Sequence, residues 1–177
     1  AYTVRYNLNT GSLNATSSSA LASSVAPALV DVAKACGTQP PVSFGASSVA
    51  GGVGRFSRNA GVYVPDVAKL LPGRTGDTTT FTLSFSLKLG KNALQGTQRL
   101  LNVRYGDSSG IFLLNGGVVL CASKGKCATS KTSFAFSADT WYFVTIATDA
   151  SGVVDVYSDG VRIATWADKS SWKSGVR

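Results

Sequence analysis

The clearest pattern in the chain is a run of alternating large apolar and small polar residues that begins at Phe81. In the segment FTLSFSLKL, Phe81, Leu83, Phe85, Leu87 and Leu89 take every second position, and Thr, Ser and Lys residues fill the positions between them. Successive side chains of a strand point to opposite faces of a sheet. The segment is therefore predicted to be a strand with one face in a core and the other toward solvent.

Further strand-like segments follow at short intervals, most of them separated by turn residues. They are RLLNVRY (99–105), GIFLLN (110–115), GVVLCA (117–122), TSFAF (132–136), WYFVTIAT (141–148), VVDVYS (153–158) and VRIATW (161–166). The last two are joined by Asp159 and Gly160, a two-residue loop whose preference for positive φ suits the twist of a hairpin. Closely spaced strands without helices between them predict an all-β sandwich or barrel built by antiparallel pairing.

The N-terminal part carries a different pattern. YTVRYNL (2–8) alternates well enough for a strand, whereas TGSLNATSSSALASS (10–24) has few large apolar residues and is expected to be a surface loop or linker. Apolar residues then recur at helical spacing up to Cys36. Because proline is tolerated in the first turn of a helix, a short helix is predicted from Pro27 to Ala35. The expected organisation is an arm with this helix over residues 1–50 and a β-sandwich over residues 51–177.

Composition agrees with a turn-rich β protein: 44% of the 177 residues are hydrophobic and 15% are charged. Lys and Arg number 17 against 9 acidic residues, and the net charge of +8 favours anionic partners such as acidic glycans, lipid headgroups or nucleic acid. Nucleic acid ranks below glycan because no recognised motif accompanies the charge. No membrane span is expected, since no apolar run approaches the roughly 18 residues required.

Two residue types that catalysis commonly uses are absent from the chain. Without histidine, Ser-His-Asp and Cys-His arrangements are excluded. A glycosidase needs two carboxylates about 5–9 Å apart. Glutamate is also absent, and Asp155 has an acidic residue at a spacing of two or four only in Asp159, which lies in a turn. A non-catalytic role is therefore expected.

The cysteines suggest a disulfide and an oxidising compartment. Cys121 and Cys127 flank the segment ASKGK, a spacing that lets the two strands of a hairpin be joined across their turn. A zinc site is the alternative, but the usual second pair of Cys or His ligands is missing. The disulfide implies a chain that is secreted or displayed on a cell or particle surface. Cys36 is left either as a buried small residue or as a partner for another chain.

The order of several segments resembles the laminin-G-like and concanavalin-A-like superfamily over roughly residues 53 to 166. These segments are FSRNAGVYVPDVAKLL, FTLSFSLKL, GIFLLNGGVVLCA and TWYFVTIATDASGVVDVYSDGVRIATW. Trp141 and Tyr142, followed by the hairpin at Asp159 and Gly160, carry most of the likeness. The resemblance implies a two-sheet antiparallel jelly-roll sandwich. The family usually adds a strand after the segment equivalent to IATW, so that sheet edge is expected to be filled by YTVRYNL or by another chain.

Fold and charge together favour a lectin-like recognition and adhesion domain that binds an anionic glycan of a cell surface or matrix, carried on a glycoprotein or proteoglycan. Basic residues would bind sulfated or sialylated groups and aromatic residues would stack on sugar rings. The candidate ligand-binding residues are Arg99, Arg104, Tyr105, Lys124, Lys126, Lys131 and Trp166. Lysines on hairpin tips also serve solubility and edge protection, and any single aromatic can belong to the core.

Two further hypotheses stay open. Lectin-like domains often hold calcium through loop aspartates, and Asp107 and Asp149 are the candidate ligands here, although aspartate in a Gly/Ser-rich turn also serves local hydrogen bonding. No other cofactor is expected. The alternative function is a structural component of a virion, fibre or surface layer, in which the N-terminal arm and a free sheet edge dock on neighbouring chains or on further copies of this one.

Overall fold

The computed structural model describes residues 4–6, 12–13, 15–18, 28–31, 33, 39–47, 51–57, 60–63, 81–101, 110–123, 126–129, 134–149, 151 and 153–166. The chain forms two compact units, Ala1–Arg74 and Thr75–Arg177. Strands in antiparallel pairs make up nearly all the regular structure of the described residues, so the all-β prediction is confirmed. Over these same residues, no helix has the length and hydropathy needed to cross a bilayer.

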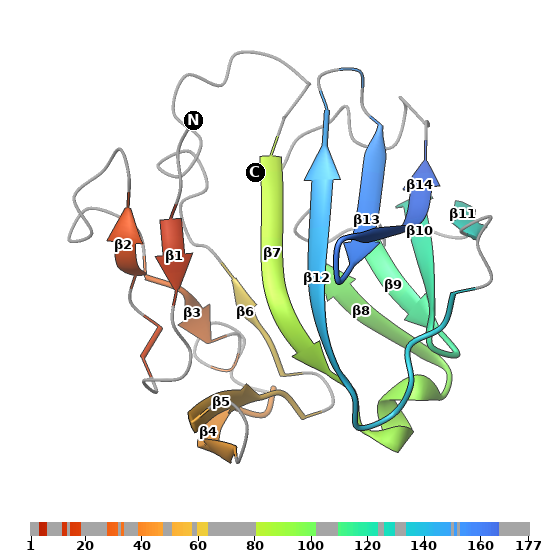
Figure 1. The fold of residues 1–177 in the computed structure, drawn as a ribbon. Helices are drawn as coiled ribbons and strands as arrows, with labels where there is room; N and C mark the ends of the chain where they lie inside the picture. The colour runs from red at the N-terminus through yellow and green to blue at the C-terminus, as the bar shows by residue number, and fades with distance from the viewer. Residues whose placement is uncertain are drawn as a thin grey trace. The chain divides into compact units, whose positions relative to one another are not determined.

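The described residues of the first unit form three short antiparallel strand pairs (Figure 1). The pairs are β1 (Val4–Tyr6) with β2 (Ala15–Ser18), β3 (Val30–Asp31) with β6 (Val62–Tyr63), and β4 (Ser43–Ser47) with β5 (Gly51–Arg55). Strand β1 confirms a strand within YTVRYNL, but it pairs with β2, which lies in the segment predicted to be a loop. Pairing satisfies the backbone groups of this Ser-rich stretch, although it has no large apolar face of its own.

The helix predicted from Pro27 to Ala35 is wrong over its described part. Two of its residues form β3, and among residues 28–31 and 33 only Ala33 has helical backbone. Asp31 is 7% exposed, and its carboxylate accepts hydrogen bonds from the backbone N–H groups of Ala33 at 2.9 Å and Val42 at 2.8 Å. The carboxylate thus ties the end of the strand to a distant segment, a contact that helical periodicity cannot reveal.

The domain boundary also differs from the expected one. A division between residues 50 and 51 would separate β4 from β5, yet these strands pair over their full length from Ser43↔Arg55 to Ser47↔Gly51. The compact units instead divide after Arg74. The hairpin was missed because its two strands are rich in glycine and small residues and show no alternation of large apolar side chains.

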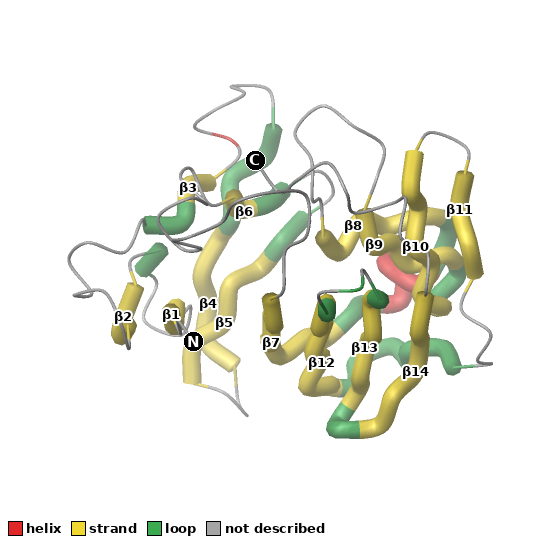
Figure 2. The backbone as a smooth tube through the Cα atoms, turned by 90° about the horizontal axis from the view of Figure 1, so that it is seen from above, coloured by secondary structure: helices red, strands yellow, loops and turns green. Residues whose placement is uncertain are grey.

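In the part of the second unit that is described, the strands form two four-stranded antiparallel sheets, which face each other in Figure 2. One sheet has the order β14 (Val161–Trp166), β13 (Val154–Ser158), β12 (Trp141–Thr148), β7 (Phe81–Lys88). The other has the order β11 (Lys126–Thr129), β10 (Gly117–Ser123), β9 (Gly110–Leu114), β8 (Thr97–Leu101). The short 3₁₀ helix η2 (Lys91–Leu94) follows β7 and precedes β8.

Both sheets contribute buried side chains to one hydrophobic cluster. Its members are Leu89, Ile111, Leu113, Val118, Leu120, Phe136, Val144, Ile146, Val154, Val156, Ile163, Ala164 and Trp166. The predicted period of two in β7 is confirmed, because Phe85 and Leu87 pack against this cluster and Leu89 belongs to it. Leu83 has the same parity but is 37% exposed.

The segment TSFAF does not form the predicted strand over its described residues 134–136. Only Ala135 makes an isolated bridge. Phe134 and Phe136 instead turn their rings edge-to-face against each other and against Tyr142, with centroids 4.9–6.2 Å apart. The Tyr142 hydroxyl accepts a hydrogen bond from the Ser137 backbone N–H at 3.0 Å, which lowers the pKa of Tyr142 from its usual value. Aromatic packing, rather than strand pairing, therefore fixes this segment.

Two hairpins turn on residues with positive φ. Asp159 and Gly160 have φ of 50° and 82°, which confirms the tight turn predicted between β13 and β14. Asn115 and Gly116, with φ of 51° and 80°, form the equivalent turn between β9 and β10. There the Asn115 side chain accepts a hydrogen bond from the Gly96 N–H at 3.0 Å, and the Asn115 N–H donates to the Gly96 carbonyl at 2.9 Å.

The two turn glycines should differ in their tolerance of a side chain. A Cβ at Gly116 would lie 3.2 Å from the Phe136 carbonyl oxygen, whereas a Cβ at Gly160 would meet nothing within 4 Å. Gly160→Ala is expected to lower the free energy of unfolding by about 1–2 kcal/mol, the cost of left-handed backbone. Gly116→Ala should cost roughly 1 kcal/mol more because its neighbour must move. Urea denaturation of both variants measures the difference, and equal losses would contradict it.

The two cysteines of the predicted disulfide lie on paired strands. Cys121 in β10 is directly opposite Cys127 in β11. Opposed residues of an antiparallel pair have Cα atoms about 4.5–5.5 Å apart, within the range that a disulfide spans. The predicted hairpin is confirmed, and the disulfide itself stays a prediction. Cys36 lies outside the described residues.

Candidate functional site

Most of the predicted ligand-binding residues cannot be placed in one patch. Arg104, Tyr105, Lys124 and Lys131 lie outside the described residues. Arg99 is in β8 and Lys126 is in β11, the two outer strands of one sheet, with β9 and β10 between them. Three strand spacings correspond to roughly 14 Å. The structure therefore does not bring this described pair together.

Arg99 has a local partner in the structure. Its guanidinium carbon lies 5.0 Å from the ring centroid of Phe112, the residue directly opposite it on β9. A cation this close to an aromatic face is attracted by the ring quadrupole. The described contact of Arg99 is thus a packing contact on its own sheet.

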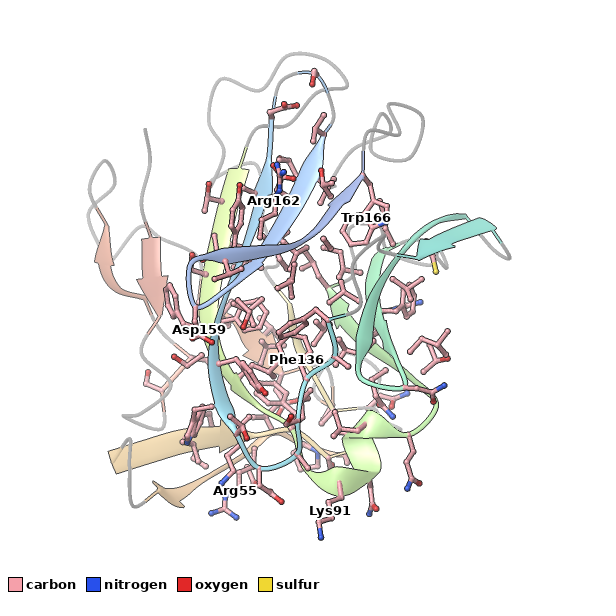
Figure 3. The ribbon with its side chains drawn as sticks, turned by 45° about the vertical axis from the view of Figure 1, so that its right-hand side comes forward. Arg55, Lys91, Phe136, Asp159, Arg162 and Trp166 are labelled. Atoms are coloured by element: carbon pink, nitrogen blue, oxygen red, sulfur yellow. The ribbon has the colours of Figure 1, made fainter. Side chains whose placement is uncertain are left out.

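Trp166 is a core residue, which corrects its assignment as a stacking residue for sugar. It is 6% exposed and belongs to the hydrophobic cluster (Figure 3). The register of β14 against β13 shifts by one residue near its middle, and the neighbouring Ile163 and Ala164 are both buried. The shift changes the parity of the strand, so that Trp166 turns inward.

Of the two candidate calcium ligands, the structure describes one and not the other. Asp107 lies outside the described residues. Asp149 is exposed, and its Oδ1 accepts hydrogen bonds from the Ser151 N–H at 2.8 Å, the Ser151 hydroxyl at 2.7 Å and the Val153 N–H at 2.9 Å. This carboxylate closes the turn between β12 and β13. No cluster of three or more potential metal ligands occurs in the part of the chain that is described, and calcium binding stays a prediction.

The sheet containing β7, β12, β13 and β14 carries a different candidate on the side away from the core. Val144, Ile146 and Thr148 of β12 are buried, so the alternate residues of this strand point outward. The register extends the same parity to the neighbouring strands. We call the resulting surface the outer face. It consists of Thr82, Ser84, Ser86, Lys88, Trp141, Phe143, Thr145, Ala147, Asp155, Tyr157, Arg162 and Thr165.

Aromatic residues of β12 lie on the outer face. Phe143 is 51% exposed, and Trp141 is half-buried. The backbone of Phe143 is held by the β13–β14 hairpin: its N–H donates to Asp159 Oδ1 at 2.9 Å, and its carbonyl accepts from the Asp159 N–H at 2.8 Å. Figure 3 shows Asp159 at this hairpin. The exposed ring therefore rests on fixed backbone.

One row of the outer face crosses all four strands. The register aligns Ser84 of β7 with Thr145 of β12, Thr145 with Tyr157 of β13, and Tyr157 with Arg162 of β14. The Ser84 and Thr145 hydroxyls lie 3.0 Å apart, in hydrogen-bond contact. At the usual strand spacing the row spans roughly 14 Å. It offers hydroxyl groups, one phenol and one guanidinium in line.

Asp155 joins the charged end of this row. A carboxylate oxygen of Asp155 lies 3.9 Å from a guanidinium nitrogen of Arg162, and the Tyr157 hydroxyl lies 3.5 Å from the other oxygen. The Arg162 side chain is 59% exposed and that of Asp155 is 22% exposed. The cation is therefore the more accessible member of the pair, as its position on β14 allows (Figure 3).

The outer face combines the groups that sugar recognition uses, namely an exposed aromatic ring, hydroxyls and one accessible charge. No protein-family model, curated protein or solved structure matches the chain.

Proposed function

We propose that the second unit is a concanavalin-A-like jelly-roll sandwich and that it works as a non-catalytic recognition and adhesion domain for an anionic glycan of a cell surface or matrix. The outer face is the binding surface. The domain works outside the cell, as the predicted disulfide between Cys121 and Cys127 would imply.

The arrangement of the strands supports the fold proposal. Strand β7 lies beside β12, followed by the meander to β13 and β14, while β8 to β11 form a second meander. The chain thus passes from one sheet to the other after β7 and returns before β12. Both sheets also share one cluster of buried side chains, as the two layers of a sandwich do.

Phe143 is the observation that carries the function proposal. A large aromatic side chain with half of its surface exposed is costly to hydrate, and here it is fixed beside a row of hydroxyl groups. Aromatic rings bind the apolar faces of sugars, and hydroxyl groups exchange hydrogen bonds with sugar hydroxyls. The net charge of +8 on the protein favours an anionic glycan as the ligand.

The proposal of a non-catalytic role rests on the carboxylates. Glutamate and histidine do not occur in the sequence, so the carboxylate pair of a glycosidase would need two aspartates. Three described aspartates already serve structure: Asp31 binds two backbone N–H groups, Asp149 closes a turn and Asp159 holds the Phe143 backbone. These assignments leave Asp155 as the carboxylate of the outer face.

A glycan array tests this function with two matched variants. Phe143→Ala is expected to weaken binding to the retained glycan about tenfold, the size of a buried aromatic contact at an interface. Phe56→Ala is the control, because Phe56 is 48% exposed but lies in the other unit. Binding should also weaken from low to physiological salt if the glycan is anionic. Retention of no glycan, or equal effects of both substitutions, would overturn the proposal.

The second candidate function is a structural role in a larger assembly, and one observation favours it. Within the described residues β7 is paired only with β12, and β1 pairs with β2 rather than with either large sheet. An eight-residue edge can receive a strand from another chain. In that case the purified chain should elute as a multimer and retain no glycan.

A further inference from the structure

The charged end of the outer face is built from three neighbouring side chains of β13 and β14. Tyr157 is directly opposite Arg162, and Asp155 lies two residues before Tyr157 on the same side of the strand. The three form a chain of contacts, from the Tyr157 hydroxyl to Asp155 at 3.5 Å and from Asp155 to Arg162 at 3.9 Å. Both distances are long for hydrogen bonds, so the polar groups of these three side chains bind one another only weakly.

Arg162 keeps donor capacity in this arrangement. The separation of 3.9 Å is an ion pair without a hydrogen bond, and this guanidinium makes no hydrogen bond to the described residues. Its side chain is 59% exposed. A guanidinium presents N–H groups in a planar fork that matches a carboxylate with two parallel bonds.

Asp155 sits behind the cation. Its Oδ1 has less than 1 Å² of exposed area and no hydrogen-bond partner. A ligand therefore meets Arg162 first, while Asp155 holds the guanidinium near the row and competes weakly for it. One cation beside one carboxylate suits a ligand group with a single negative charge, since a more highly charged group would be repelled by Asp155.

We propose that Arg162 binds the carboxylate of an acidic sugar, an inference that rests on the proposed glycan-binding function. The sugar chain runs along the row from Arg162 past Tyr157 toward Thr145 and Ser84. Tyr157 and the hydroxyl groups of Thr145 and Ser84 contact the rest of the sugar chain. Asp155 weakens the binding because its carboxylate competes with that of the sugar for the same guanidinium.

The test compares ligands that differ only in the carboxylate. The probes are an oligogalacturonide and sialyllactose, each compared with its own fully methyl-esterified form by calorimetry against the full chain. We expect the protein to bind the free acid of one pair about tenfold or more tightly than the neutral form of that pair. The pair that shows the preference identifies the source of the carboxylate as a uronic or a sialic acid. Equal binding of acid and neutral forms in both pairs would overturn the inference.

Variants assign the preference to a residue. Arg162→Gln should bind the acid no better than its neutral form. Asp155→Asn should bind the acid roughly two- to fivefold more tightly, because the substitution removes a like charge that forms a weak ion pair with the same guanidinium. Lys91→Gln, which removes one charge from η2, is the control. It should change neither the binding of the acid nor the preference for the acid over its neutral form. A preference that survives in Arg162→Gln, or a weaker acid binding by Asp155→Asn, would overturn the assignment.

Failure of this inference can be told from failure of the proposed function. If the neutral sugars bind and Phe143→Ala weakens them, the outer face binds glycans but Arg162 does not select acids. If none of the four probes and no glycan of the array is retained, the glycan-binding function itself fails. Circular dichroism of each variant confirms that it is folded, which the exposure of Arg162 and Lys91 favours.

Discussion

Replacement of Trp166 with alanine is expected to lower the free energy of unfolding by about 3–5 kcal/mol, the cost of removing a large buried aromatic side chain. Trp166 is 6% exposed and packs in the cluster shared by both sheets of the second unit. The remaining cavity would adjoin β14, which forms an outer strand of its sheet, and the strand should lose its fixed position. Guanidinium denaturation followed by far-UV circular dichroism measures the change.

Phe143→Ala is the matched comparison, because it also removes an aromatic side chain but at a position that is 51% exposed. Its effect on stability should be within about 1 kcal/mol, while its effect on glycan binding should be large. If Trp166→Ala kept wild-type stability and lost glycan binding, Trp166 would be a ligand residue and its placement in the core would be wrong.

Ile146→Ala is expected to cost about 2–5 kcal/mol of unfolding free energy. Ile146 is fully buried in the middle of β12, opposite Leu83 of β7 and Val156 of β13. Truncation removes contacts from a strand that has neighbours on both sides, so little relaxation can fill the cavity. The midpoint of urea denaturation, with an unchanged slope, reports this loss.

Val161→Ala provides the comparison for an apolar residue at the surface. Val161 begins β14 and is 67% exposed, and its truncation should change the unfolding free energy by no more than about 0.5 kcal/mol. A similar loss in Ile146→Ala and Val161→Ala would mean that Ile146 is not at the centre of the packed cluster.

Local patterns predicted the strands that have a strong signal of their own. The alternation from Phe81 to Leu89 and the Asp159–Gly160 turn are confirmed because both depend on short-range geometry: strand parity in one case and positive φ in the other. The helix from Pro27 was wrong over its described part because the pairing of β3 with β6 and the hydrogen bond from the Val42 N–H to Asp31 involve residues far along the chain. Such contacts override a local preference.

The outer face was missed because its parity is hidden in the sequence. The segment WYFV at the start of β12 has four apolar residues in a row, so nothing local shows which two face the core. The buried Val144, Ile146 and Thr148 settle the question and turn Trp141 and Phe143 outward. Reading backward from TIAT could have suggested this parity, whereas the alignment of Ser84 with Arg162 across four strands requires the sheet order.

The register shift between β13 and β14 determines how the second unit would respond to the loss of one residue in β14. Ile163 and Ala164 are adjacent and both buried, so that Arg162 and Thr165, three residues apart, both lie on the outer face. Deletion of either buried residue would restore strict alternation and leave Arg162, Thr165 and Trp166 on their present sides. Loss of Ile163 or Ala164 should therefore remove the register shift and one buried side chain without reversing the two faces of the strand.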